Sequence, residues 1–185
     1  TERTPALTIQ AKHALNDVIR QFPKKKYRKG EVIYTPEETA QDIYFIHDGR
    51  VKVVSYSQEG KELIKKLFGQ GDFFGEGALL RRQPRHNFAI ATTPMTISVL
   101  PVVELHPLLQ RDPQLNLFFL SLFSRQLIEL EQRLESIVFQ SSRSRILAYL
   151  VALIEEKGER VGFEWVLRRF MSHQDIANIT ATSRQ

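Results

Sequence analysis

One long segment without glycine or proline divides this sequence. It follows Asp112-Pro113 and runs to about Val138. Asp before Pro is a typical helix start, because the carboxylate can cap free backbone N–H groups and proline is tolerated at the first helical position. Apolar residues in the segment recur at alternating spacings of three and four, the pattern of a coiled-coil seam, at Leu120, Phe123, Leu127, Leu130, Leu134 and Ile137. We therefore predict a long helix over 112–139.

This helix has two candidate partners. A long helix with its own apolar seam usually needs a second helix, which favours pairing with another copy of the chain; the alternative is a single core helix of a monomer. Phe118, Phe119 and Leu122 lie outside the seam. The N-terminal half of the helix is therefore expected to bury a second face, and the seam predicts a homodimer.

The residues before the long helix have the texture of strands. From about 27 to 103, short runs of Val, Ile, Tyr and Phe are separated by turn signals. Asp48-Gly49 stands between the apolar runs 43–46 and 51–53, and Asp-Gly in that setting predicts that the two runs pair as a hairpin. Short strands at intervals of about ten residues favour a sandwich or a roll. Apolar residues at helical spacing predict one amphipathic helix over 6–22, through Leu7, Leu15, Val18, Ile19 and Phe22.

The residues after the long helix predict a small helical module. Ser141-Ser142 starts a helix that Gly158 ends, and its buried face is expected at Ile146, Leu147, Leu150, Val151 and Ile154. Strand-like residues 163–167 follow. Ser172 can cap a short helix with an inner face of Ile176, Ala177 and Ile179, and a turn at 180–182 leads to Ser183, which can cap the next. This order is typical of a helix-turn-helix, although a plain helical hairpin has the same composition.

Composition excludes some chemistry. The chain has no cysteine, which rules out disulfides, Cys-based zinc sites, a Cys nucleophile and a cysteine-ligated iron–sulfur cluster. The absence of cysteine fits a reducing cytoplasm, where we expect the protein. No apolar run approaches the roughly 20 residues that a membrane helix needs, so we expect no membrane partner. The net charge of +5 permits nucleic-acid binding, but the cations concentrated in 24–29 are equally typical of a solvated surface. Because the first residue is Thr1, we expect a processed or truncated gene product.

Several segments, taken in order, resemble the Crp/Fnr family of transcription regulators. They extend over nearly the whole chain: Gly30-Glu31-Val32-Ile33-Tyr34, the YxIxxGxVxV-like segment 44–53, Gly60-Lys61-Glu62-Leu63, Gly71-Asp72-Phe73-Phe74-Gly75-Glu76, Ser172-His173-Gln174-Asp175-Ile176-Ala177 and Ser183-Arg184. The resemblance implies an α+β fold in three parts. A jelly-roll-like β-roll sensor domain with flanking short helices would cover 1–111, a dimerisation helix 112–139, and a partial winged helix-turn-helix, ending at the start of its recognition helix, 140–185.

Within the roll, residues 74–80 followed by Pro84-Arg85 resemble the phosphate-binding cassette of that family. The cassette implies an effector site at Gly75, Glu76, Gly77, Ala78, Arg85 and His86. Glu76 could accept from a ribose 2′-hydroxyl and Arg85 could donate to a phosphate, while the Gly-rich start of a short helix offers backbone N–H groups. Alternatively, Glu76 and Arg85 pair with each other and fix the loop.

The sequence departs from the nucleotide-binding pattern in two places. His86 and Asn87 stand after the arginine where binders have Ser or Ala and then Ala; His86 could be a phosphate donor, a pH-sensitive group or an ordinary surface imidazole. On the long helix, Leu127, Leu130 and Glu131 are expected to face the effector, and the last two replace the Thr-Ser pair that contacts adenine. A polar group left unpaired costs about 1–3 kcal/mol. A cyclic nucleotide, another small molecule or no ligand at all therefore remain alternatives.

The last residues resemble the DNA-reading end of the family. Arg184 falls at the start of the recognition helix, and arginine binding guanine is the commonest specific base contact. Gln185 could read adenine, and Ser172, His173 and Ser183 could contact phosphates. The resemblance implies that the complete protein, with the rest of the recognition helix, has double-stranded DNA and RNA polymerase as partners.

Two other classes of protein are weighed against a regulator. A cupin-type metal enzyme would need clustered ligands such as a His-x-His pair, and the five histidines are never spaced that way. No P-loop, Gly-x-Ser-x-Gly or His-Glu-x-x-His motif occurs either, so we do not expect an enzyme. A cyclic-nucleotide-binding regulatory module without DNA binding would lack the helix-turn-helix.

Overall fold

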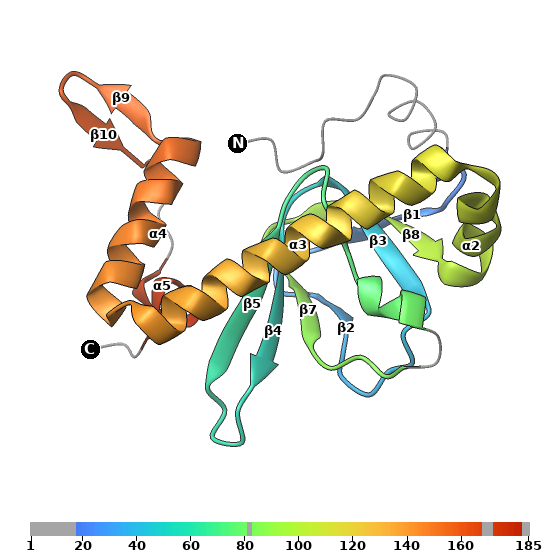
Figure 1. Ribbon diagram of the computed structural model, residues 1–185, viewed down its shortest axis with the longest axis horizontal. Helices are drawn as coiled ribbons and strands as arrows, with labels where there is room; N and C mark the ends of the chain where they lie inside the picture. Colours follow the sequence, from blue (N-terminus) through green and yellow to red (C-terminus); the bar gives the residue numbers. More distant parts are fainter. Residues whose placement is uncertain (1–17, 81–82, 168–171, 183–185) are drawn as a thin grey trace.

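The computed structural model describes residues 18–80, 83–167 and 172–182. A roll of two four-stranded sheets lies against helix α3, Pro113–Phe139, and a small module of two helices and a hairpin lies at the far end of that helix (Figure 1). Asp112 starts α3 as predicted, since its carboxylate accepts from the backbone N–H groups of Gln114 and Leu115. The long helix thus connects two separate bodies of structure.

Both sheets of the roll are antiparallel. The first has the strand order β1-β8-β3-β6, with bounds Lys24–Tyr27, Met95–Pro101, Asp42–Asp48 and Phe73–Phe74. The second has the order β2-β7-β4-β5, with bounds Val32–Tyr34, Phe88–Ala91, Val51–Tyr56 and Glu62–Phe68. A short 3-10 helix, η1, spans Glu76–Leu80 after β6. The interior between the sheets is apolar and includes Ile46, Val51, Phe74 and Ile97.

The predicted hairpin at Asp48-Gly49 is wrong. β3 pairs with β8 and β6, while β4 pairs with β5 and β7, so this turn carries the chain from one sheet to the other. The local signal was still correct, because Gly49 has a φ of 91°. The turn residues and the alternating pattern predict that the chain reverses at this point. They do not predict that β3 and β4 pair, because each strand buries one face between the sheets in either case.

A second apolar cluster attaches the roll to the helices. The ring of Phe73 lies 5.9 Å from that of Phe118 and 5.1 Å from that of Phe119. Helix α2, Val102–Arg111, contributes Leu105 to the same cluster. The prediction that Phe118, Phe119 and Leu122 bury a second face of the long helix is confirmed. Of the amphipathic helix expected over 6–22, residues 18–20 are helical and Val18, Ile19 and Phe22 are buried; 6–17 lie outside the described residues.

The C-terminal module contains α4, Ser142–Lys157; a hairpin of β9, Glu159–Val161, and β10, Glu164–Val166; and α5, His173–Thr180. Ser141 caps α4 and Gly158 ends it, as predicted. The buried face predicted for this helix is wrong at Leu147 and Val151, which are exposed, whereas Leu153 is buried. The reason is that α5 packs against only one side of α4 in the single chain, which leaves the other apolar side open.

Candidate effector pocket and nucleic-acid interface

The cassette begins with a glycine that the fold requires. Gly75 follows β6 with a φ of 84°, and a Cβ atom there would lie 3.0 Å from the Tyr44 ring and 3.1 Å from Nη1 of Arg85. Ala78 of η1 is buried and anchors the loop, while Glu76 and Gly77 are exposed. The loop is therefore pressed onto the roll at Gly75 and open to solvent at the next two residues.

Arg85 is buried and points into the roll. Its Nη1 donates to the carbonyl oxygen of Gly75 at 2.9 Å and its Nη2 to that of Asp42 at 2.7 Å. The guanidinium carbon lies 4.2 Å from the centre of the Tyr34 ring, a cation–π distance. Arg85 thus fixes the loop through backbone carbonyls rather than through the Glu76 pair considered from the sequence. A guanidinium has five N–H donors, so two carbonyls do not exhaust it.

Two tyrosines enclose this arginine. Burial raises the pKa of Tyr34 far above its usual value and that of Tyr44 to about 12, although the nearby Arg85 charge opposes both shifts. The two rings are stacked with centres 5.9 Å apart. Both phenols therefore stay protonated at neutral pH and keep an O–H donor.

The cassette opens into a large cavity of about 1900 Å³ between the roll, α3 and the C-terminal module. Of the predicted effector residues, Gly75, Glu76, Gly77, Arg85 and His86 line it, together with Leu127 and Leu130 of α3. Ala78 is the buried residue of η1, and Glu131 is exposed on α3. Such a volume exceeds the 300–1,000 Å³ typical of a small-molecule site, because the pocket continues into the space between the two bodies.

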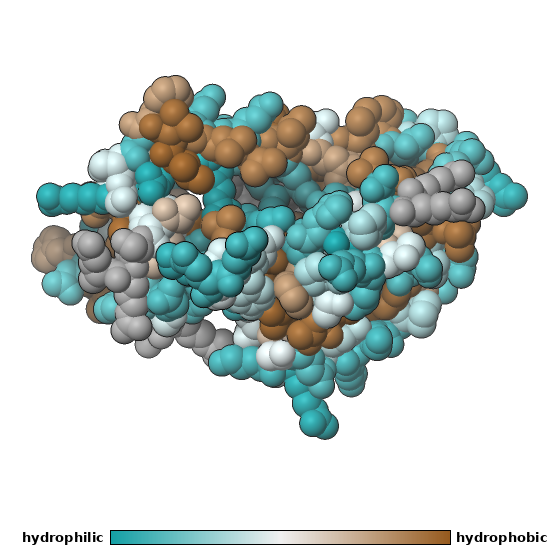
Figure 2. Space-filling model, turned by 90° about the horizontal axis from the view of Figure 1, so that it is seen from below, coloured by the Kyte–Doolittle hydropathy of each residue, from teal (hydrophilic) through white to brown (hydrophobic). Residues whose placement is uncertain are grey.

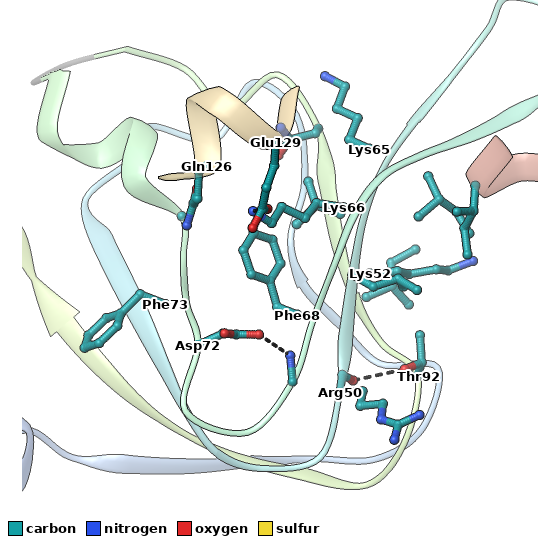
Figure 3. A pocket seen from close by; sticks show the side chains of 18 of the residues that line it. Arg50, Lys52, Lys65, Lys66, Phe68, Asp72, Phe73, Thr92, Gln126 and Glu129 are labelled. Atoms are coloured by element: carbon teal, nitrogen blue, oxygen red, sulfur yellow. Dashed lines mark hydrogen bonds and ion pairs between the residues drawn. The ribbon is translucent and has the colours of Figure 1, made fainter. Parts of the chain in front are cut away.

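Figure 3 shows one wall of this cavity, where charged side chains of β5 and α3 face each other. Nζ of Lys66 lies 2.6 Å from a carboxylate oxygen of Glu129. Phe68 lies beside this ion pair, with its ring 5.3 Å from the same ammonium. The pair joins the sensor sheet to the long helix across the pocket, and sequence analysis did not single out either residue.

The predicted seam of α3 is open to solvent in the single chain. Leu120, Leu127, Leu130 and Leu134 are each more than half exposed, Ile137 is 39% exposed and Phe123 is half-buried. Hydrophobic side chains gather along the upper edge of the face shown in Figure 2. An apolar row of this length is unusual for a monomer surface and marks an interaction surface.

The predicted first helix of the helix-turn-helix is present as α5. The Ser172 hydroxyl accepts from the N–H of Asp175 at 3.1 Å and donates to its carboxylate at 2.7 Å. Ala181 has a φ of 52° and ends the helix in the left-handed conformation, which forms the predicted turn. Of the inner face, Ile176 and Ala177 are buried and Ile179 is half-buried. Ser172 and His173 are exposed, while Ser183, Arg184 and Gln185 lie outside the described residues.

Comparison with known proteins gives one consistent answer. The family model of the cyclic nucleotide-binding domain matches residues 24–112. The chain is 26% identical to the global nitrogen regulator of Nostoc sp. (strain PCC 7120) over 92% of its own length and 81% of that protein. It is 26% identical to the cyclic AMP receptor protein of Thermus thermophilus, over 89% of this chain and 73% of that one.

Solved structures agree. A CRP/FNR-family transcriptional regulator from Thermus thermophilus is 27% identical, with a TM-score of 0.70, over 86% of this chain and 79% of that one. The chain is similar to CRP/FNR-family regulators in sequence and in fold. The c-di-GMP-responsive global regulator CLP of Xanthomonas campestris has the same fold, with a TM-score of 0.82 at 19% identity, over 93% of this chain and 86% of that one.

The similarity to these regulators confirms the predicted α+β fold and supports the predicted function, a transcription regulator with a cyclic nucleotide-binding domain. Two further findings concern the described part of this regulator. Its helices there include none with the length and apolarity to cross a bilayer. Across residues 18–80, 83–167 and 172–182, no three His, Asp or Glu side chains gather where they could hold a metal ion.

Proposed function

We propose that this regulator binds a small effector at the cassette of residues 75–86 and reads duplex DNA as a cytoplasmic homodimer without enzymatic activity. The domains are those predicted from the sequence: a sensor over 1–111, a dimerisation helix over 112–139 and a DNA-reading module over 140–185. One observation carries the proposal: a single cavity is lined both by cassette residues and by α3, the helix that leads into the module. A ligand in this cavity would contact both the cassette and α3, and could therefore favour one arrangement of the sensor relative to the DNA-reading module.

The cassette supports an effector with an anionic group. Arg85 keeps N–H donors beyond the two that its carbonyl partners use, and Glu76 offers an exposed acceptor beside it. A cyclic nucleotide has both of the groups that these side chains recognise, and one relative is named for cyclic AMP. Leu130 and Glu131 argue against adenine recognition of the Thr-Ser kind, so other cyclic nucleotides belong in the same test.

The dimer and the DNA contacts follow from the two ends of α3. The exposed seam supports pairing of α3 with a second copy, which would place two recognition helices about 34 Å apart, one turn of DNA. Arg184 and Gln185 would read bases, while Ser172, His173 and Ser183 would bind phosphates. RNA polymerase is the partner that a transcription regulator of this kind requires.

Thermal unfolding tests the effector. The protein is heated with and without millimolar cyclic AMP, cyclic GMP or cyclic di-GMP; a ligand at 100 times its Kd adds about 2.7 kcal/mol, which shifts Tm by several degrees. Glu76→Gln is the matched variant, because Glu76 is exposed and its loss should weaken binding without altering the Tm of the free protein. If none of the three nucleotides shifts Tm, the cyclic-nucleotide assignment is wrong.

Selection from a random duplex library, with protein that includes the complete recognition helix, tests the DNA reading. We expect enrichment of an inverted repeat with half-sites 10–10.5 base pairs apart. Arg184→Ala should relax the preference at one position of each half-site, whereas His173→Ala should weaken binding to all sequences equally. Failure to enrich any two-fold symmetric site would contradict the proposal.

A further inference from the structure

One arginine of α3 reaches both the sensor and the DNA-reading module. Nη2 of Arg133 donates to the carbonyl oxygens of Ile64 on β5 and Ile179 on α5, each at 2.7 Å, and Nη1 donates to that of Lys65. The three acceptors belong to two segments that are far apart in the sequence, β5 and α5. Burial lowers the pKa of Arg133, although a guanidinium remains charged at neutral pH. A single half-buried cation therefore holds a strand and a helix of different domains.

The strand is shaped to receive this arginine. β5 is an edge strand of its sheet, so the carbonyls on its outer side have no strand partner. Its register against β4 shifts between Val53, opposite Lys66, and Val54, opposite Ile64. Lys65 is therefore the extra residue of a β-bulge. A bulge redirects the local backbone, and here two consecutive carbonyls, which point to opposite sides in a regular strand, reach the same guanidinium.

A second contact joins the same two elements. The carboxylate of Glu62, at the start of β5, accepts from the side-chain amide of Asn178 on α5 at 3.2 Å. Lys52 at 2.7 Å and the Tyr56 hydroxyl at 2.9 Å hold the same carboxylate from the sensor side. The contacts within the roll thus hold the Glu62 carboxylate in place independently of α5, and Asn178 donates to an acceptor whose position the roll already fixes.

On the α5 side, the contacts fall at the helix end that leads into the turn. The last carbonyls of a helix have no partner within it. Arg145 of α4 donates to those of Thr180 at 3.0 Å and Ala181 at 3.2 Å, and Arg133 takes that of Ile179. Arg145 acts within the module, whereas Arg133 adds the link to the sensor. The position of the turn is therefore set from two sides.

We propose that Arg133 is a positioning residue that docks the DNA-reading module on strand β5 of its own chain. Ile64, Lys65, Arg133 and Ile179 all line the cavity, so a displacement of β5 is passed to α5 directly, besides any shift of the dimer helix. This inference rests on the proposed function for the role of the module in reading DNA. The docking itself can be tested without effector or DNA, so its failure is distinguishable from failure of the proposed function.

Hydrogen–deuterium exchange of the whole chain separates docking from simple helix capping. Arg133→Ala should speed amide exchange about tenfold or more both in 62–68 of β5 and in 173–181 of α5. Arg145→Ala removes the other carbonyl cap and should speed exchange in α5 while leaving β5 unchanged. Arg143→Ala removes an exposed arginine of α4 and should change neither.

Two results would overturn the proposal. Faster exchange in α5 alone for Arg133→Ala would make this residue a helix cap and nothing more, and unchanged exchange in both segments would show that no docking exists in solution. If circular dichroism shows Arg133→Ala to be globally unfolded, Asn178→Ala replaces it. That variant should loosen both segments, whereas Tyr56→Phe, which removes only a sensor-side bond to Glu62, should leave α5 unchanged.

Discussion

At the scale of single residues, Arg85 has a structural role in the cassette besides any contact with an effector. Hydrogen bonds to charged groups contribute about 1.5–3 kcal/mol each, and Arg85 makes two to backbone carbonyls, one buried and one partly buried. We expect Arg85→Ala to lower the free energy of unfolding by about 2–4 kcal/mol, measured by urea denaturation. Arg85→Lys should recover only part of the lost stability, because an ammonium group cannot reproduce the planar arrangement of N–H donors of a guanidinium. If Arg85→Ala is as stable as the parent, the inward orientation is wrong.

His47 gives a residue-scale prediction on pH. Its Nε2 lies 2.8 Å from the hydroxyl oxygen of the fully buried Ser98. Burial lowers the pKa of His47, and the neighbouring Lys24 charge adds to this. The unfolded chain therefore binds a proton near pH 6.5 that the folded one does not, so this contribution to stability is present above about pH 6.5 and lost as pH falls towards the folded pKa.

Proton NMR titration of the His47 ring checks this directly, and a folded-state pKa above 6.5 would contradict it. Lys24→Gln should raise the pKa only part of the way back, because burial is the larger cause. His47→Gln should flatten the fall in stability between pH 7.5 and 5.5 relative to the parent.

At the scale of elements, the crossing from β3 to β4 depends on Gly49. A Cβ atom there would lie 2.3 Å from Cβ of Met95 and 2.5 Å from the carbonyl oxygen of Pro94. Gly60, with a φ of 77° in the β4–β5 turn, has nothing within 4 Å of the same position. Gly60→Ala should therefore lower the free energy of unfolding only by the cost of a left-handed backbone conformation in alanine, about 1–2 kcal/mol. Gly49→Ala adds a steric clash and should lower it by at least about 2 kcal/mol more. Thermal unfolding measures both losses. Equal losses would show that the close approach to β8 relaxes freely.

Element ends were predictable from the sequence, and element partners were not. Asp112, Ser141 and Ser172 each cap the helix that follows, because capping is chemistry between residues a few positions apart. Strand pairing after Gly49 is decided by tertiary packing, which alternation does not encode. Likewise, the exposure of Leu147 on α4 depends on what packs against that helix.

The same contrast holds for the candidate site. Glu76 and Arg85 could be found because their residue types match a cassette pattern. Asp42 contributes its backbone carbonyl to Arg85, and a carbonyl has no residue-type signature. Arg133 meets Ile64 across 69 positions of sequence, again through a carbonyl. Contacts of this kind emerge only from the folded chain.

At the scale of the whole molecule, α3 links every part of the proposed mechanism. Its N-terminal half is anchored to the roll by Phe118 and Phe119, its middle lines the cavity, and its C-terminal half contacts α5 through Arg133. The exposed seam runs along the same helix beside the face that packs on the roll, and two of its residues, Leu127 and Leu130, also line the cavity. A partner helix could therefore pair with the seam without displacing the packing of Phe118 and Phe119 on the roll.

The dimer prediction follows from that separation of faces. Leu130 and Ile128 are both 52% exposed on α3, but only Leu130 lies in the seam; Ile128 points well away from it on a helix of 3.6 residues per turn. By light scattering, we expect the parent to have twice the chain mass of 21.5 kDa. Leu130→Glu would place two carboxylates in a buried apolar contact and should weaken dimerisation about 100-fold or more, about 2.7 kcal/mol, with little change in Tm of the isolated chain. Ile128→Glu should remain dimeric. A monomeric parent would refute the seam as an interface, and dissociation by Ile128→Glu alone would place the interface on the opposite face.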